Sequence, residues 1–267
     1  SYDKSINIKQ MIKETIKSIE NQQYCGKIYI NIIDDGSTDG SLELLKSMEL
    51  SPNITLIESK HKGKAFALNK GLEKVKTDYV ITVDSDTILH PLAVRNIMNK
   101  LVNSNKKTAA TAGCLFVKNA KKSFITKLQE WDYTLGIFGV KLTQCQYNST
   151  LVAQGAFSAY KTKPLREIGG WQNCIGEDIV LTWELLSRGY ETNFSKNAIA
   201  FTEVPEKFSN LGKQRRRWAR GMIEAFKKVK ILTLKKLNFK SKFLMCLNVF
   251  FPFIDFALLI FVPLGLI

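Results

Sequence analysis

The chain alternates short apolar runs with segments of helical periodicity, and this pattern constrains its fold more than any other feature. Strands are expected at 28–33, 54–57, 79–83, 108–117, just before Gly155 and at 198–201. Helices are expected at 8–19, 42–48, 65–75, 91–102, 124–138, after Gly176 and at 211–229. Such an alternation predicts an α/β fold with a mostly parallel sheet and with ligands at the carboxyl ends of the strands.

Both ends of the chain are expected to be truncated. A sheet of this kind should begin with an apolar strand, whereas Ser1 leads directly into a helix. Residues 243–267 are almost wholly apolar, and this stretch exceeds the ~20 residues that cross a bilayer as a helix. We predict the start of a transmembrane region there, in which Asp255 faces protein or water rather than lipid. A buried core helix is the alternative.

The formal net charge of +15 is concentrated in one segment. Residues 213–242 carry 12 Lys and Arg against a single acid, Glu224. A basic block beside an apolar tail points to a membrane surface or an anionic ligand rather than to nucleic acid. Because four apolar residues in this block follow helical spacing, we predict an amphipathic helix that lies in the lipid headgroup layer. Its apolar face consists of Ala219, Met222, Phe226 and Val229.

Two aspartates directly follow the strand predicted at 79–83. Asp84 and Asp86 are residues i and i+2 of an extended segment, so their carboxylates point to the same side. This arrangement suits Mg²⁺ or Mn²⁺, which bind one or two carboxylates together with substrate phosphates. A polar exit from the strand is the alternative, because Asp also favours turns.

A second acidic pair, Asp34 and Asp35, follows the strand predicted at 28–33, so both pairs are expected on one rim of the sheet. A carboxylate in this position can accept hydrogen bonds from a base or a ribose. The alternative is helix capping by Ser37 or Asp39, and both interpretations can hold at once.

Two helix starts carry further candidates. Lys64 follows a glycine at the start of a helix and can meet a diphosphate, although a solvated lysine is the alternative. Glu177 and Asp178 open another helix, where a carboxylate can serve as the general base for a hydroxyl. Acids are also common in a first helical turn because of the helix dipole alone.

The last motif lies at the start of the basic block. Gln214, Arg217 and Trp218 share one face of a helix, at positions i, i+3 and i+4. An arginine gives fork-like hydrogen bonds to phosphate, and a tryptophan offers a flat apolar platform for a sugar ring. A basic surface helix with one buried tryptophan is the alternative.

Taken together, these motifs resemble family 2 glycosyltransferases of the GT-A fold, in their processive, membrane-embedded branch. The resemblance covers residues 2 to about 235, and it lies in the order of five motifs. The segment from Glu177 to Leu185 is most similar to poly-β-1,6-N-acetylglucosamine and cellulose synthases. The resemblance implies a GT-A domain at 1–212, with a Rossmann-like mixed sheet flanked by helices. It further implies a QxxRW element with a basic interface helix at 213–242 and a transmembrane region from 243.

The resemblance also implies a role for each candidate residue. Asp178 would be the catalytic base, and Asp84 and Asp86 the catalytic metal ligands, with Asp86 the more direct one. The donor nucleotide sugar would be bound by Tyr2, Asp34, Asp35, Lys64, Asp84, Gln214 and Arg217. The acceptor sugar would be bound by Gln154, Gly155, Glu177 and Trp218.

The resemblance implies an inverting, metal-dependent transfer of N-acetylglucosamine or glucose from UDP to a growing β-linked polysaccharide. The full-length protein would be a multi-pass protein of the cell membrane with a cytoplasmic catalytic domain, and its partners would include the bilayer and accessory membrane subunits. Nucleic acid is not among the expected partners. One alternative is a non-processive enzyme that acts on a lipid or lipid-phosphate acceptor; such enzymes generally lack the QxxRW element. The other is a membrane-tethered module that binds anionic polymers without catalysis.

Overall fold

A computed structural model describes residues 2–229, 239 and 242–244 of the chain. The first third contains α1 (Tyr2–Glu20), β1 (Ile30–Asp34), α2 (Ser41–Ser47), β2 (Ile54–Glu58) and α3 (Lys64–Lys74). The middle contains β3 (Tyr79–Val83), β4 (Thr87–Leu89), α4 (Ala93–Val102), β5 (Thr108–Val117), α5 (Phe124–Asp132), the π-helix η1 (Tyr133–Gly139) and α6 (Val140–Cys145). The last part contains β6 (Phe157–Lys161), α7 (Thr162–Glu167), α8 (Glu177–Ser187), β7 (Glu191–Thr202) and α9 (Phe208–Lys228).

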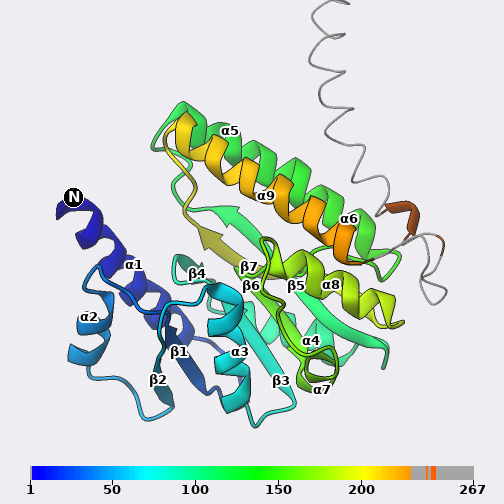
Figure 1. The fold of residues 1–267 in the computed structure, drawn as a ribbon, viewed down its shortest axis with the longest axis horizontal. Coiled ribbons are helices and arrows are strands. Elements are labelled where there is room, and N and C mark those ends of the chain that lie inside the picture. Colours follow the sequence, from blue (N-terminus) through cyan, green and yellow to red (C-terminus); the bar gives the residue numbers. More distant parts are fainter. Residues whose placement is uncertain (1, 230–238, 240–241, 245–267) are drawn as a thin grey trace, which may run out of the picture.

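The strands of the described residues form a mixed arrangement (Figure 1). The larger sheet has the order β3-β6-β5-β7-β4, and β1 pairs with β2 separately. β5 and β7 are parallel, and so are β1 and β2, but β6 runs antiparallel to both β3 and β5, and β4 runs antiparallel to β7. The expectation of a mostly parallel sheet is therefore wrong for the larger sheet, because alternation identifies strands but does not encode their direction. The mixed sheet implied by the resemblance is confirmed.

The larger sheet is covered on both faces by helices. All but one of the β5 residues are buried, as expected for a central strand. On one face α4 buries Ile97 and Leu101 completely, in the same cluster as Phe157 of β6. Another cluster joins Leu165 of α7 and Leu185 of α8. These contacts fix the strand ends from which the candidate site residues project.

The helix expected at 124–138 is longer and less regular than predicted. It runs from α5 through the π-helix η1 into α6, and it ends at Cys145. π-Helical turns occur frequently at functional sites, because the extra residue per turn re-aims the side chains that follow. Here the π-helical turn begins at Tyr133, beside residues that contact α9.

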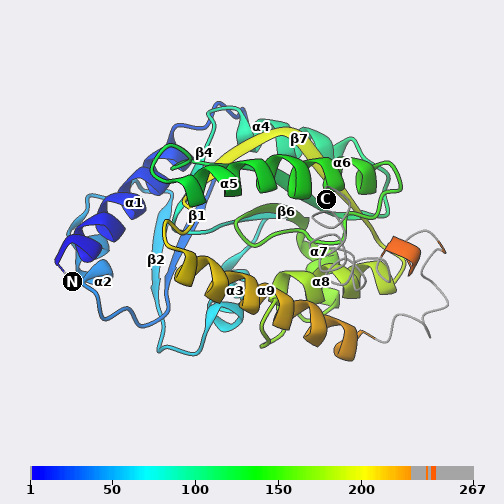
Figure 2. The same cartoon turned by 90° about the horizontal axis from the view of Figure 1, so that it is seen from above.

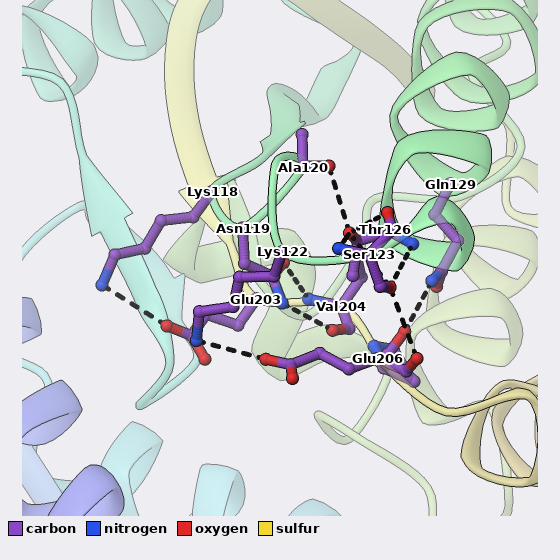
Figure 3. Close-up of polar contacts among 11 residues, drawn as sticks. Lys118, Asn119, Ala120, Lys122, Ser123, Thr126, Gln129, Glu203, Val204 and Glu206 are labelled. Atoms are coloured by element: carbon purple, nitrogen blue, oxygen red, sulfur yellow. Dashed lines mark hydrogen bonds and ion pairs between the residues drawn. The ribbon is translucent and has the colours of Figure 1, made fainter.

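A polar network fastens the start of α5 to the segment that leads into α9 (Figure 3). The side chain of Asn119 donates to the carbonyl oxygen of Val204 at 2.9 Å and accepts from its amide at 3.0 Å. Gln129 of α5 donates to the carbonyl oxygen of Pro205 at 2.8 Å. Ion pairs add to the network, namely Lys118–Glu203 and Lys122–Glu206. The two long helices are thus joined near their first turns; seen from above they diverge toward their other ends (Figure 2).

Three further features differ from the sequence-based expectations. In the described residues no strand lies directly before Gly155; β6 begins just after it, at Phe157, and residues 151–155 bond to side chains instead of a strand ladder. β4, α6 and α7 are too short for the sequence pattern to reveal them.

The third correction concerns the apolar face of α9. Ala225 and Val229 are buried and Met222 and Phe226 half-buried in a cluster with α8, and Phe226 stacks edge-on against Trp183 at 5.1 Å between ring centroids. The predicted lipid-facing stripe therefore packs on protein from Met222 onward.

The remainder of the basic block and the predicted transmembrane region lie almost wholly outside the described residues. Within the part of the chain that the structure describes, no helix combines the length and apolar character needed to span a bilayer.

Candidate functional site

Lys64 is the centre of a carboxylate cluster at the end of β3. Its ammonium lies 2.6 Å from Oδ1 of Asp84 and 3.6 Å from Oε1 of Glu177. Burial of the ammonium would lower the pKa of Lys64, but the charges of Asp84, Glu177 and Asp178 outweigh burial and the pKa is raised. Lys64 therefore joins the first aspartate of the strand-end pair to the acidic start of α8, two motifs about 90 residues apart in sequence.

Asp86 lies beside Asp84 in a half-buried position. Burial raises the pKa of Asp86, and the neighbouring charge of Asp84 raises it further. Two carboxylates this close repel each other unless a cation neutralises them. Among the described residues no group of three or more His, Cys, Asp or Glu side chains could hold a metal. Asp84 and Asp86 supply two carboxylates, which suit Mg²⁺ or Mn²⁺ where a diphosphate provides the remaining ligands.

Asp178 is held by backbone amides at the start of α8. Its Oδ2 accepts from the amide of Gly155 at 3.2 Å, and its Oδ1 accepts from the amide of Ile179 at 2.8 Å. Each carboxylate oxygen keeps a further lone pair, so Asp178 is oriented and still able to accept a proton. Its neighbour Glu177 has a raised pKa, because of burial first and the charge of Asp178 second.

Gly155 lies directly against this cluster. A Cβ atom at this position would lie 2.7 Å from Nζ of Lys64, so a larger residue here would shift the flexible end of that side chain. The neighbouring Gln154 donates to the carbonyl oxygen of Gly113 at 2.6 Å, while its own Oε1 is buried without a partner. The segment of Gln154 and Gly155, which the resemblance implies would bind the acceptor, thus lies beside Asp178 and Lys64.

Asp34 and Asp35 differ in what they bind. Asp34 is buried and accepts from the amides of Gly36 and Ser37, at 3.0 and 3.1 Å, so it shapes its own turn. Asp35 accepts from the amides of Lys62 and Gly63, at 3.0 and 2.9 Å. Because Lys64 follows immediately, the loop at 61–64 connects Asp35 with Asp84. The two acidic pairs are therefore close, but they follow strands of two different sheets rather than lying on one rim of a single sheet as expected.

The N-terminal half of α9 reaches the site through residues that the sequence did not single out. Arg215 pairs with Asp132 of α5 at 2.5 Å and lies over the ring of Trp218, 4.6 Å from its centroid. Burial raises the pKa of Tyr133 to about 12; the charge of Arg215 opposes this rise, and Asp132 and Asp86 add to it. Tyr133 therefore lies within electrostatic reach of both Asp86 and the α9 cation.

The predicted residues of α9 differ from one another in burial and in contacts. Gln214 has a buried Oε1 without a partner, and Trp218 is half-buried against the same cluster as Tyr133. Arg217 is exposed, and no contact draws it to Asp84, Asp86 or Asp178 in the described part of the chain. The side chain of Tyr2, at the start of α1, lies outside what the structure describes.

A close helix contact sets the position of α9 against α8. Gly176, in a left-handed conformation with φ of 83°, lies so close to Gly221 that a Cβ on either residue would be within 3.0 Å of the other's Cα. The amide of Ile175 donates to Oε2 of Glu224 at 2.9 Å. The two glycines therefore bring the start of α8, with Glu177 and Asp178, against the second half of α9.

Comparison with protein families identifies a match over most of the chain. The model of a family described as "Glycosyltransferase like family 2" matches residues 5–221. Poly-beta-1,6-N-acetyl-D-glucosamine synthase of Staphylococcus aureus strain COL is 31% identical over 241 residues, which are 90% of this chain and 58% of the relative. The enzyme of the same name from Staphylococcus epidermidis is 30% identical over 217 residues, 80% of this chain and 52% of the relative. The chain thus spans little more than half the length of these curated relatives.

Solved structures share the fold. Mannosyltransferase PcManGT from Pyrobaculum calidifontis, in complex with GDP-Man and Mn²⁺, superposes with a TM-score of 0.66 at 21% identity, covering 82% of this chain and 61% of that one. S. aureus TarS 1-349 in complex with UDP-GlcNAc gives 0.62 at 16% identity, covering 88% and 66%. These likenesses confirm the mixed α/β, GT-A-like architecture.

Proposed function

The chain belongs to family 2 of the glycosyltransferases, and from this premise we propose that it transfers N-acetylglucosamine from UDP to the end of a β-linked polymer. The observation that carries the proposal is Lys64, whose ammonium joins Asp84 and Glu177 at 2.6 and 3.6 Å. These contacts support a proposed donor site that adjoins the start of α8, where the proposed base Asp178 follows Glu177. Similarity to poly-β-1,6-N-acetylglucosamine synthases supports the choice of sugar.

The donor is proposed to lie along the rim from Asp35 to Asp86. Asp35 would accept from the nucleoside, and Lys64 would exchange a carboxylate for the diphosphate when the donor enters. Asp86 with Asp84 would hold Mg²⁺ or Mn²⁺, which supplies positive charge for the leaving diphosphate. Gln214 and Arg217 of α9 would contact the same diphosphate from the other side, and Trp218 would meet the acceptor sugar.

Asp178 is proposed to act as the general base. The acceptor hydroxyl loses its proton to Asp178 while its oxygen bonds to the anomeric carbon of the donor. The bond from that carbon to the diphosphate oxygen breaks on the opposite side, so an α-linked donor gives a β-linked product. The amides of Gly155 and Ile179 hold the carboxylate in the required orientation, at 3.2 and 2.8 Å.

Product analysis tests this function. The protein in detergent is incubated with Mn²⁺, an N-acetylglucosamine oligomer and, in separate reactions, UDP-N-acetylglucosamine, UDP-glucose or GDP-mannose, and the products are weighed by mass spectrometry. We expect oligomers extended by N-acetylglucosamine with the first donor alone. Absence of product with every donor, or transfer to added lipid phosphate instead of the oligomer, would contradict the proposal.

We propose further that this reaction takes place at a lipid bilayer, which the apolar ridge of the long helix contacts. The ridge consists of five side chains that are 39–75% exposed: Phe124, Leu128, Trp131, Leu135 and Leu142. A large apolar surface on one continuous helix is typical of helices that lie in the headgroup layer. The adjoining first half of α9 presents exposed arginines, which favour anionic lipid.

Sedimentation with vesicles tests the membrane contact. The double variant Leu128→Glu/Trp131→Glu should co-sediment at least about tenfold less with phosphatidylcholine–phosphatidylglycerol vesicles than the wild type, because each change places a charge in the contact. Val102→Glu is the matched control, since Val102 of α4 is 52% exposed and lies outside the ridge. Equal sedimentation of both variants would show that lipid does not cover the ridge.

A further inference from the structure

Residues 150–156, which we call the strap, run between α6 and α8 and carry Gly155 to the candidate base. On the α8 side the strap is held by three residues of the helix's first two turns. Leu151 O accepts from Nε1 of Trp183 at 3.1 Å, the Ala153 amide donates to Oγ1 of Thr182 at 2.9 Å, and the Gly155 amide donates to Asp178. The strap and the carboxylate of Asp178 therefore move together.

On the other side the strap is held by α6. The amide of Leu151 donates to Oε1 of Gln144 at 3.0 Å. The ammonium of Lys141, one turn earlier on the helix, donates to the carbonyl oxygen of Val152 at 2.7 Å. Both α6 side chains are buried, at 7% exposure for Lys141 and 6% for Gln144, so neither bond is shared with bulk water.

Lys141 is an unusual residue to bury in this place. A lysine is almost never fully buried without a charged partner, and no carboxylate pairs with it among the described salt bridges. The ionisable groups that act on it are Asp178 of α8 and Cys114 of β5. Burial lowers the pKa of Lys141 to about 7, and the charges of these two groups oppose the decrease. Burying this lysine destabilises the fold, which suggests that it has a role in the site.

We propose that Lys141 is a positioning residue, which fixes the strap against α8 so that the Gly155 amide stays on the carboxylate of Asp178. Its ammonium bonds the carbonyl oxygen of Val152, three residues before Gly155. Loss of that bond leaves the Leu151–Gln144 bond as the strap's remaining hydrogen bond to α6, and leaves Asp178 less well oriented. The predicted effect on catalysis rests on the proposed function, whereas the effect on the strap does not.

Hydrogen exchange and kinetics of Lys141→Met test the proposal, with Lys163→Met as the control for removal of a lysine, since Lys163 of α7 is exposed. In Lys141→Met the amides of Ala153 and Gly155 should exchange at least about tenfold faster, because the buried hydrogen bond that holds the Val152 carbonyl is lost, while α8 amides keep their rates. Sugar transfer at saturating donor should fall at least about tenfold, and the Kd for UDP should stay within about a factor of two.

Unchanged exchange of the strap, or an equal increase in the strap and in α8, would overturn the proposal, since the latter indicates general loosening. If Lys141→Met does not fold, Lys141→Gln provides the same test. Its side chain is one atom shorter, so exchange should increase in the strap alone; unchanged strap exchange or an increase shared with α8 again overturns the proposal. If the wild type transfers no sugar, the proposed function fails, and the exchange measurement still decides the role of Lys141.

Discussion

The candidate residues lie in two regions that differ in how far they contact one another. One region is the carboxylate rim, the cluster around Lys64 at the end of β3 and the start of α8, and the other is the first half of α9. At the rim, Lys64, Asp84, Glu177, Asp178 and Gly155 already contact one another directly or through a shared partner. On α9 two of the three predicted residues are unengaged, since Arg217 is exposed and Gln214 has a buried oxygen without a partner, whereas Trp218 packs beneath Arg215. The fold itself therefore brings the proposed base and the proposed metal ligands together, whereas the proposed diphosphate contacts of α9 make no contact with them within the residues that the structure describes.

The largest effect is expected at the rim, from Asp178→Asn. The amide side chain keeps the shape of the carboxylate and loses its ability to take a proton, so the transfer rate should fall by about 10²–10⁴-fold. The Kd for UDP, measured by calorimetry, should not change. A near-normal transfer rate would show that Asp178 is not the base, and the rim would then no longer differ from α9 in holding an assembled catalytic group.

The buried lysine that holds the strap, Lys141, should affect the pH dependence of the free energy of unfolding. The pKa of Lys141 is lowered to about 7 from 10.5, so between these values the unfolded chain binds more protons than the folded one. The free energy of unfolding therefore rises with pH in this window, by about 2 kcal/mol from pH 7 to 9. Below pH 7 the destabilisation caused by burying Lys141 is fully present. Urea unfolding at both pH values should show this gain in the wild type relative to Lys141→Met; parallel curves would show that Lys141 is not buried as described.

The joint between the two regions is tested by a pair of glycine variants of α9. In Gly221→Ala the new Cβ would lie 2.9 Å from Cα of Gly176, so it should separate α8 from α9 and cost about 1–3 kcal/mol in unfolding free energy. In Gly212→Ala the new Cβ meets nothing within 4 Å, and the helix should gain about 0.5–1 kcal/mol. Equal changes in both variants would mean that the contact between the helices is loose.

The smallest effect separates two neighbouring arginines. Arg217→Ala should leave the melting temperature unchanged and weaken UDP binding by about tenfold, because a charge-assisted hydrogen bond to phosphate is lost. Arg215→Ala breaks the pair with Asp132, whose side chains are 39% and 42% exposed, so it should cost at most about 1 kcal/mol of stability. The opposite assignment, with UDP binding lost in Arg215→Ala alone, would move the diphosphate contact by half a turn.

How well the sequence predicted each feature depends on how far apart in the chain the interacting residues are. β3 and β5 were predicted with the bounds that the structure has, because their apolar runs are local. Asp84 and Asp178 could be proposed as site residues because they stand at a strand end and a helix start, and the structure joins both to the cluster around Lys64. Arg215 and Lys141 were missed, because their roles depend on partners 83 and 11 residues away.

The surface of α9 shows a different limit of sequence reasoning. Helical spacing correctly identified an apolar face, including Met222 and Phe226, but the same spacing suits a protein neighbour and a lipid surface equally well. The structure places that face on α8 and leaves the ridge of α5 exposed instead. Only the three-dimensional arrangement distinguishes the two surfaces.

The central claim is that the rim binds a nucleotide and a divalent cation together. Because the proposed metal ligands from the protein are two aspartates, Asp84 and Asp86, Mn²⁺ should bind weakly alone and much more tightly once UDP supplies phosphate oxygens. Calorimetric titration of Mn²⁺ with and without UDP measures this directly, in the wild type and in Asp86→Asn. We predict strong coupling in the wild type and its loss in Asp86→Asn; equal Mn²⁺ affinity in both proteins, or no coupling to UDP, would contradict the claim.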